Sequence, residues 1–114
     1  MIYKYVYSFP LEKENVQEWL KFAEEVITTR NDEFTKMHAR IGVTKESWYL
    51  KEDKKDFEVM VYTEADNKNF SEKFQNDKSD FSDWFKSEVG RIQNYNLNEG
   101  VIMPKQVLDW VAPD

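Results

Sequence analysis

The sequence predicts an α+β fold in which helices cover one antiparallel sheet. Three observations support this prediction. Residues 2–9 alternate between two sets of side chains with the period of a β-strand, two further alternating runs flank a charged turn, and the stretches before and after this hairpin repeat apolar residues every three to four positions. The element order is therefore strand, helix, strand, strand, helix, strand, and its strands and helices form separate layers.

The composition limits the classes of protein to consider. A length of 114 residues predicts a single domain, residues 1–114. The absence of cysteine excludes disulfides and thiol nucleophiles and fits a reducing compartment. A formal net charge of −6 argues against a nucleic-acid partner, because phosphate backbones bind basic surfaces. We find no signal peptide and no apolar stretch of membrane-spanning length, so we expect a soluble cytoplasmic protein with no membrane partner.

The first strand, residues 2–9, has two different faces. One face carries aromatic side chains and the other is mixed; the two sets are Tyr3, Tyr5, Tyr7 and Phe9 against Ile2, Lys4, Val6 and Ser8. A lysine beneath helices would be costly in a strand that we expect to be central, so the Lys4 face is predicted to point away from the helices. Pro10 cannot donate a backbone hydrogen bond and is predicted to end the strand.

Two helices are predicted before the hairpin. Over residues 12–29, an apolar stripe recurs at helical spacing and consists of Val16, Trp19, Leu20, Ala23, Val26 and Ile27. A second, shorter helix carries Phe34, Met37 and Ile41 on one side. We expect Asn31 or Asp32 to cap its start and Gly42 to provide a left-handed cap at its end.

The hairpin pairs residues 45–51 with residues 57–64 through the turn "KEDKKD". Phe57, Val59 and Val61 form a set that faces the helices, which leaves Met60 and Tyr62 on the far side together with one of Trp48 or Tyr49. This far face is more apolar than a monomer normally exposes. A second copy packed sheet against sheet would cover it, so a homodimer is predicted.

The last third of the chain predicts two helices and a strand. Residues 67–76 form one helix, and Ser79 can cap a stronger one whose stripe consists of Phe81, Trp84, Phe85, Val89 and Ile92. The loop "NLNEGVIMP" follows, and residues 105–111, "KQVLDWV", are predicted to be the fourth strand.

The element order and four motifs resemble a known superfamily. The motifs are "RNDEF", "GVTKESWYL", "VYTEAD" and "SDFSDWFKSEV", and the similarity spans about residues 2–111. The chain resembles the ferredoxin-like βαββαβ domains that form dimeric α/β barrels, and in particular a small family of uncharacterised bacterial proteins among them. The resemblance implies a four-stranded antiparallel sheet with helices on one face. Because the superfamily includes cofactor-independent monooxygenases, isomerases and members with no known chemistry, it implies a pocket rather than a reaction.

Candidate site residues lie on the hairpin. Glu46 and Trp48 share one side of their strand, and Tyr62 and Glu64 share one side of the next. A carboxylate beside aromatic rings can line a pocket in which Trp48 and Tyr62 stack a planar ligand between the two sheets of a dimer. Lys4 could pair with one of the acids on the far face. The ordinary alternative is hairpin packing with the acids at wet strand ends.

Proton transfer has two candidate residues, His38 and Glu64. His38 is the single histidine, and its ordinary pKa lies near neutrality. It can equally be a boundary residue of the second helix. With one histidine and no cysteine, the sequence predicts no metal site, and "DNKNFSEKFQND" lacks the glycine of a calcium loop. No cofactor motif is present.

Two functions therefore remain open. The first is a non-catalytic module that binds a small molecule or serves as a structural dimer. The alternative is a cofactor-independent monooxygenase or isomerase acting on a planar or acidic organic substrate. An RNA-recognition domain shares the element order, but the charge is wrong and the aromatic third-strand motif lacks its basic and glycine positions.

Overall fold

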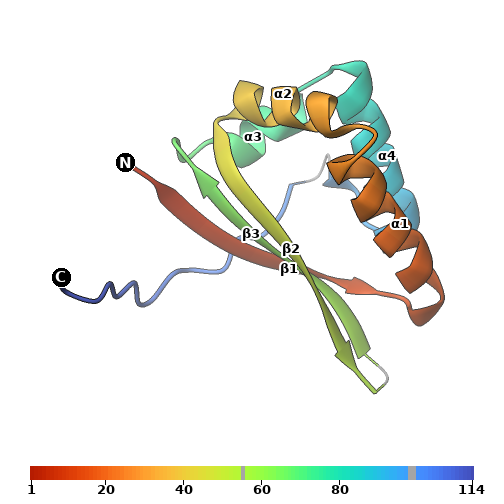
Figure 1. Cartoon of the computed structure of the whole chain (residues 1–114), viewed down its shortest axis with the longest axis horizontal. Helices are drawn as coiled ribbons and strands as arrows, with labels where there is room; N and C mark the ends of the chain where they lie inside the picture. The colour runs from red at the N-terminus through yellow and green to blue at the C-terminus, as the bar shows by residue number, and fades with distance from the viewer. Residues whose placement is uncertain (55, 98–99) are drawn as a thin grey trace.

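The computed structural model describes residues 1–54, 56–97 and 100–114, and it is α+β as predicted (Figure 1). The elements in chain order are β1 (Tyr3–Leu11), η1 (Lys13–Asn15), α1 (Val16–Ile27), α2 (Asn31–Ile41), β2 (Val43–Asp53), β3 (Asp56–Ala65), α3 (Phe70–Asn76) and α4 (Asp80–Gln93). None of the helices in these residues has the length and apolar character needed to cross a membrane.

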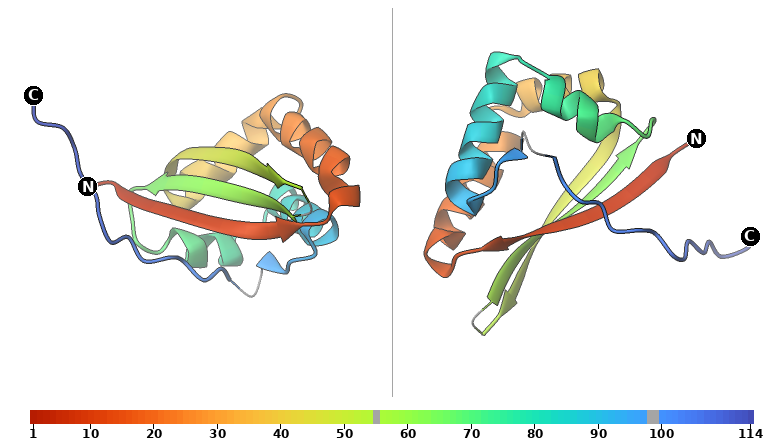
Figure 2. Two further views of the ribbon diagram at one scale, coloured as in Figure 1. Left: turned by 90° about the horizontal axis from the view of Figure 1, so that it is seen from below. Right: turned by 180° about the vertical axis from the view of Figure 1, so that it is seen from behind.

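The sheet has three strands in the order β1-β3-β2, with both neighbouring pairs antiparallel. The predicted fourth strand at residues 105–111 is not formed in the described chain, where this segment is irregular and runs past β1 toward its N-terminal end (Figure 2). Alternating apolar residues make a segment suited to a strand, but a strand forms only where its backbone can pair with a neighbour. As a result β1, which we expected to be central, is an edge strand.

Pro10 does not end β1. The strand continues to Leu11, and Pro10 is registered opposite Glu58 of β3. Because β1 pairs on one side only, a residue without an N–H can sit in the strand with its nitrogen facing outward, which is the position in which sheets accept proline. The hairpin is also longer than expected: β2 and β3 extend to Asp53 and Asp56, so its turn is shorter than "KEDKKD", and position 55 of that turn lies outside the described residues.

The helices lie on one side of the sheet, and the other side carries no helix among the described residues (Figure 2). The predicted faces are confirmed: Phe9, Val59 and Val61 are buried beneath the helices, whereas Val6 on the opposite face is 45% exposed. On β2 it is Tyr49 that points outward, with 60% exposure. Trp48 points inward and packs on Trp19 and Phe22.

The core stripe of α1 is rotated from the predicted one. Its buried members are Val16, Trp19, Phe22 and Val26. Leu20 and Ile27, which the spacing placed in the stripe, are 42% and 69% exposed. On an amphipathic helix several stripe assignments share the same period, and the sheet selects the one that brings the largest rings inward, here Trp19 and Phe22.

Two of the three predicted helix caps are confirmed. Gly42 ends α2 with a φ of 79°, and the Ser79 hydroxyl accepts the backbone N–H of Ser82 at the start of α4. The third prediction is wrong, because Asn31 is already the first residue of α2 and Arg30 precedes it without a side-chain cap. Arg30 instead packs its guanidinium 4.1 Å from the ring of Trp84, which lies at the edge of the core.

Candidate functional site

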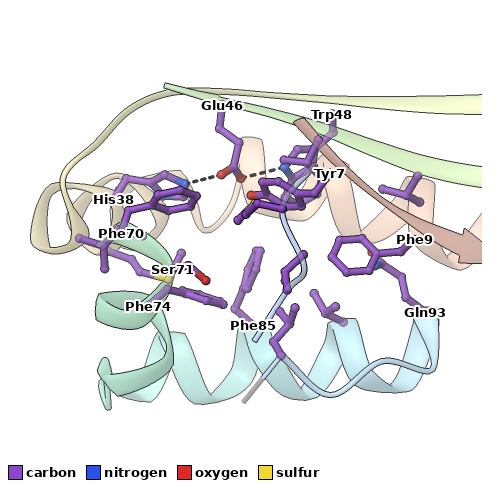
Figure 3. A pocket seen from close by; sticks show the side chains of 18 of the residues that line it. Tyr7, Phe9, His38, Glu46, Trp48, Phe70, Ser71, Phe74, Phe85 and Gln93 are labelled. Atoms are coloured by element: carbon purple, nitrogen blue, oxygen red, sulfur yellow. Dashed lines mark hydrogen bonds and ion pairs between the residues drawn. The ribbon is translucent and has the colours of Figure 1, made fainter. Parts of the chain in front are cut away.

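A cavity of about 80 Å³ lies between the covered face of the sheet and the helices (Figure 3). All three strands line it, and so do α1, α2, α3, α4 and the segment after α4. Its walls are predominantly apolar, with the aromatic rings of Phe9, Phe70, Phe74, Phe85 and Trp48 around it. The strands supply this lining because alternate residues of each strand point to the same face.

Trp48 is the centre of the aromatic wall. Its ring stacks on Phe22 with centroids 5.8 Å apart and lies 6.0 Å from the rings of Trp19 and Phe85. Phe34 meets it edge-on at 6.1 Å. Offset and edge-to-face contacts of this kind fix the orientation of rings, so this part of the wall is preorganised.

A hydrogen-bonded network of polar side chains interrupts this apolar wall. His38 on α2 places its Nε2 3.2 Å from Oε1 of Glu46 on β2, and the other Glu46 oxygen accepts the indole N–H of Trp48 at 2.8 Å. Thr63 donates to Oε1 of Glu46 at 3.4 Å, and the Tyr7 hydroxyl lies 3.0 Å from the Thr63 hydroxyl. Glu46 therefore has three donors around it, as a buried carboxylate requires.

The contacts of His38 define its protonation state. Its Nδ1 lies 2.9 Å from the carbonyl oxygen of Phe34, so that both ring nitrogens face acceptors. Only the imidazolium can donate from both nitrogens. Burial lowers the pKa of His38, but the hydrogen bond and the charge of Glu46, with the Phe34 carbonyl, outweigh burial and raise it above its ordinary value. Below this raised pKa, His38 and Glu46 form a buried ion pair.

Tyr7 is embedded in the same network. Its side chain lines the cavity. Burial, followed by the negative charge of Glu46, raises the pKa of the Tyr7 hydroxyl far above its ordinary value, which the hydrogen bond to Thr63 opposes only in part. The phenol of Tyr7 is therefore neutral throughout the physiological range.

The structure divides the predicted site residues between the two faces of the sheet. Glu46, Trp48 and His38 lie together at the cavity. Tyr62 and Glu64 lie on the uncovered face, because Trp48 is registered opposite Val61 and Ser47 opposite Tyr62. A single pocket containing both Trp48 and Tyr62 is therefore not formed within one chain.

The residues on the uncovered face make contacts of their own. The Tyr62 hydroxyl donates to Glu64 at 2.7 Å, and this hydrogen bond is the main reason that the pKa of Tyr62 rises to about 12. Lys4 pairs with Asp109 of the C-terminal segment at 3.3 Å. Lys4 was expected to pair with an acid of the hairpin, but Asp109 is the partner found.

Three polar residues near the cavity were not predicted as site residues from the sequence. Thr63 stands on the same face as Val59 and Val61, so a hydroxyl within an apolar face was the available signal. Gln93 extends the stripe of α4 and accepts the indole N–H of Trp19 at 3.2 Å. Ser71, in the first turn of α3, lines the cavity. Its sequence context is that of an ordinary exposed helix residue and gave no signal.

Ser71, His38 and Glu46 line one cavity, yet they are not connected as a catalytic triad. In a triad, one histidine nitrogen binds the acid and the other accepts the serine proton. Here the second nitrogen of His38 binds the Phe34 carbonyl. No group of three or more His, Asp or Glu side chains in the described residues is arranged to hold a metal ion. The arrangement is suited to enclosing a small organic molecule.

The fold and the site together define a small α+β protein with an aromatic cavity beneath a three-stranded sheet. The chain matches no protein-family model, no curated protein and no solved structure.

Proposed function

We propose that this protein is a small-molecule-binding module of the ferredoxin-like, dimeric α/β-barrel class, and that it holds a planar organic molecule in the cavity beneath its sheet. The observation that supports the proposal is the cavity, walled by aromatic rings and carrying a hydrogen-bonded polar cluster on one side. Apolar walls with a few placed polar groups are typical of ligand pockets. The cysteine-free composition supports a cytoplasmic location.

The size of the cavity limits the ligand. A volume of about 80 Å³ is available. Since each enclosed water needs roughly 10–15 Å³ on this scale, the cavity has room for roughly five to eight non-hydrogen atoms. This corresponds to a single six-membered ring with one substituent. Larger planar molecules would require the walls to move.

Binding without chemistry is better supported than catalysis. A cofactor-independent monooxygenase or isomerase needs a base with a free lone pair beside its substrate. In this cavity both His38 nitrogens face acceptors, and three of the roughly four lone-pair sites of the Glu46 carboxylate already face donors. The position of this pair at the cavity wall is the one observation that favours the enzyme, and it would require the pair to separate when substrate binds.

A homodimer completes the proposal. The uncovered face exposes Val6 and Tyr49, and the C-terminal segment exposes Val107, Leu108 and Trp110 by 71–87%. The outer edge of β1 has no strand beside it among the described residues. A second copy packed against this face would bury both surfaces, and residues 105–111 could then pair along β1 as the fourth strand.

Toluene tests the cavity, since it has seven non-hydrogen atoms and no polar group. We expect it to raise the melting temperature of the wild type and to change the fluorescence of the tryptophans at the cavity wall. Val101→Phe should abolish both effects, because Val101 lines the cavity and the larger ring would fill it. Ile27→Phe is the matched control, since Ile27 is 69% exposed at the end of α1, outside the cavity and the proposed dimer surface. If toluene has no effect on the folded wild type, the proposed function is wrong.

A further inference from the structure

On the polar side of the cavity, the hydrogen bonds from Tyr7 through Thr63 to Glu46 have a fixed donor-to-acceptor direction. Thr63 lies between Tyr7 and the carboxylate of Glu46 and has one proton to donate. If that proton pointed toward Tyr7, the lone pairs of Thr63 would face the carboxylate oxygen 3.4 Å away with no proton between them. The favourable arrangement runs in one direction, from the Tyr7 hydroxyl to Thr63 and from Thr63 to Glu46.

This direction determines what Tyr7 can offer a ligand. Its only proton is committed to Thr63, so its oxygen presents an accepting lone pair. Figure 3 shows the Tyr7 side chain and the Glu46 carboxylate on the same side of the cavity. Several other acceptors on the wall already face donors: the Glu46 carboxylate accepts from His38, Trp48 and Thr63, and the Gln93 carbonyl accepts from Trp19. The Ser71 hydroxyl on α3 also lines the cavity, and it can both donate and accept.

The charges around the cavity disfavour an anion. The cation at its wall is His38, and both of its N–H groups already face acceptors. A buried anion without a cationic partner bears a large desolvation cost, which the neutral groups of Ser71 and Gln93 would not offset. Glu46 would in addition repel a second negative charge.

From this geometry, and resting on the proposed function, we infer that the cavity selects a neutral ligand with a hydrogen-bond donor, such as a phenol or a small alcohol, and that Tyr7 determines this specificity by accepting the ligand's proton donor. The single ring that fits the cavity and the accepting Tyr7 oxygen on its polar side together describe a phenol-like molecule. Carboxylates of the same size are excluded.

The test compares phenol with toluene, which have the same number of non-hydrogen atoms, in the wild type and in Tyr7→Phe. Phenol is better hydrated than toluene, so their affinities differ even without a contact to Tyr7. The informative quantity is therefore the change in the ratio of the two affinities between the wild type and Tyr7→Phe. One neutral hydrogen bond contributes a net 0.5–1.5 kcal/mol, so Tyr7→Phe should lower the phenol-to-toluene ratio roughly two- to twelvefold. The affinity for toluene should remain unchanged or increase.

A second pair of probes tests the exclusion of anions. 1-Pentanol and butyrate each have six non-hydrogen atoms, and we expect calorimetry to detect pentanol binding but not butyrate binding at neutral pH. An unchanged phenol-to-toluene ratio in Tyr7→Phe, or butyrate binding comparable to pentanol, would overturn the inference while leaving toluene binding, and with it the proposed function, intact. Failure of toluene to bind the wild type would instead contradict the proposed function.

A second variant covers the case in which Tyr7→Phe does not fold. Thr63→Val keeps the shape of the side chain and removes the acceptor of the Tyr7 proton. The hydroxyl group of Tyr7 can then donate its proton to a ligand in the cavity. Cyclopentanone, which only accepts, should gain affinity relative to cyclopentane in this variant. No gain would show that the Tyr7 proton was not committed to Thr63, which contradicts the polarity on which the inference rests.

Discussion

His38 on α2 and Glu46 on β2 place Nε2 and Oε1 3.2 Å apart, with side-chain exposures of 11% and 12%. The two residues are joined across elements that the chain links through Gly42, where α2 ends and β2 begins. Because both charges are largely withdrawn from water, each depends on the other. The contact has consequences that can be measured.

The first prediction concerns the pH dependence of stability. The pKa of His38 is raised in the folded state, so the protonated residue stabilises the fold. This contribution is fully present below the unfolded pKa, which is about 6.5, and is lost as the pH rises through the higher folded pKa. The difference in unfolding free energy between the wild type and His38→Gln should therefore be largest near pH 5–6 and smaller at pH 9. Urea titrations at several pH values measure it; a difference that grows with pH would contradict the ion pair.

A second pH effect, of opposite sign, should arise at Asp77. Arg40 donates two hydrogen bonds to this carboxylate at 2.8 and 2.9 Å, and Ser82 also donates to it. The hydrogen bonds from Arg40 are the main reason that its pKa falls to about 2. A lowered pKa gives stability that is present above the unfolded pKa, near 3.9, and is lost as the pH falls toward 2.

The matching experiment compares the wild type with Asp77→Asn. We expect the variant to be less stable at pH 7 and the gap between the two proteins to narrow steadily from pH 4 to pH 2. Asp80→Asn is the control, since Asp80 lies in the first turn of α4 outside this cluster. A gap that is independent of pH would mean that the Asp77 charge has no role.

A third prediction separates the two faces of β2. Trp48→Ala removes a ring that packs against four other aromatic side chains, and loss of a large core ring costs roughly 3–5 kcal/mol. Its neighbour Tyr49 points to the uncovered face and is 60% exposed, so Tyr49→Ala should cost roughly 1 kcal/mol or less in the monomer. Chemical denaturation of both variants, each combined with Val6→Glu to keep the protein monomeric, measures the difference. Equal costs would contradict the assignment of the faces.

A fourth prediction concerns Gly42. Its φ is 79°, and a Cβ at this position would collide with the side chains of Asp66 and Asn67. Gly42→Ala should therefore destabilise the protein by at least roughly 1–2 kcal/mol. Gly90→Ala is the control: Gly90 lies inside α4 without a positive φ, and the new methyl group would approach the Tyr95 carbonyl at 3.2 Å. Thermal unfolding should show the smaller change for Gly90.

The fifth prediction tests the homodimer. Light scattering at micromolar concentration should give about twice the chain mass of 13.8 kDa. Val6→Glu on the uncovered face should dissociate the dimer, because it places a charge in the proposed interface. Leu20→Glu is a matched control, since Leu20 on α1 is 42% exposed and Val6 is 45% exposed. A wild-type mass near 13.8 kDa would exclude the dimer under these conditions.

The sequence by itself determined the class of fold and the faces of β1 and β3, whereas it left open which of Trp48 or Tyr49 on β2 faces the helices. The period of the side chains was sufficient to identify the helices and the hairpin, and Lys4 was sufficient to orient β1, because a lysine is costly beneath helices. Local chemistry also determined the caps at Gly42 and Ser79, since each depends on a few consecutive residues.

Only the tertiary structure decided which side chains come together on each face of the sheet. Register brought Glu46 and Trp48 to the covered side and Tyr62 to the open side, which divided the predicted pocket. Residues 105–111 have the pattern of a strand but are irregular, although no strand lies beside the outer edge of β1 among the described residues. Tyr7, Thr63 and His38 join Glu46 from three different elements. Contacts between residues distant in sequence depend on packing geometry, and local periodicity carries no information about that geometry.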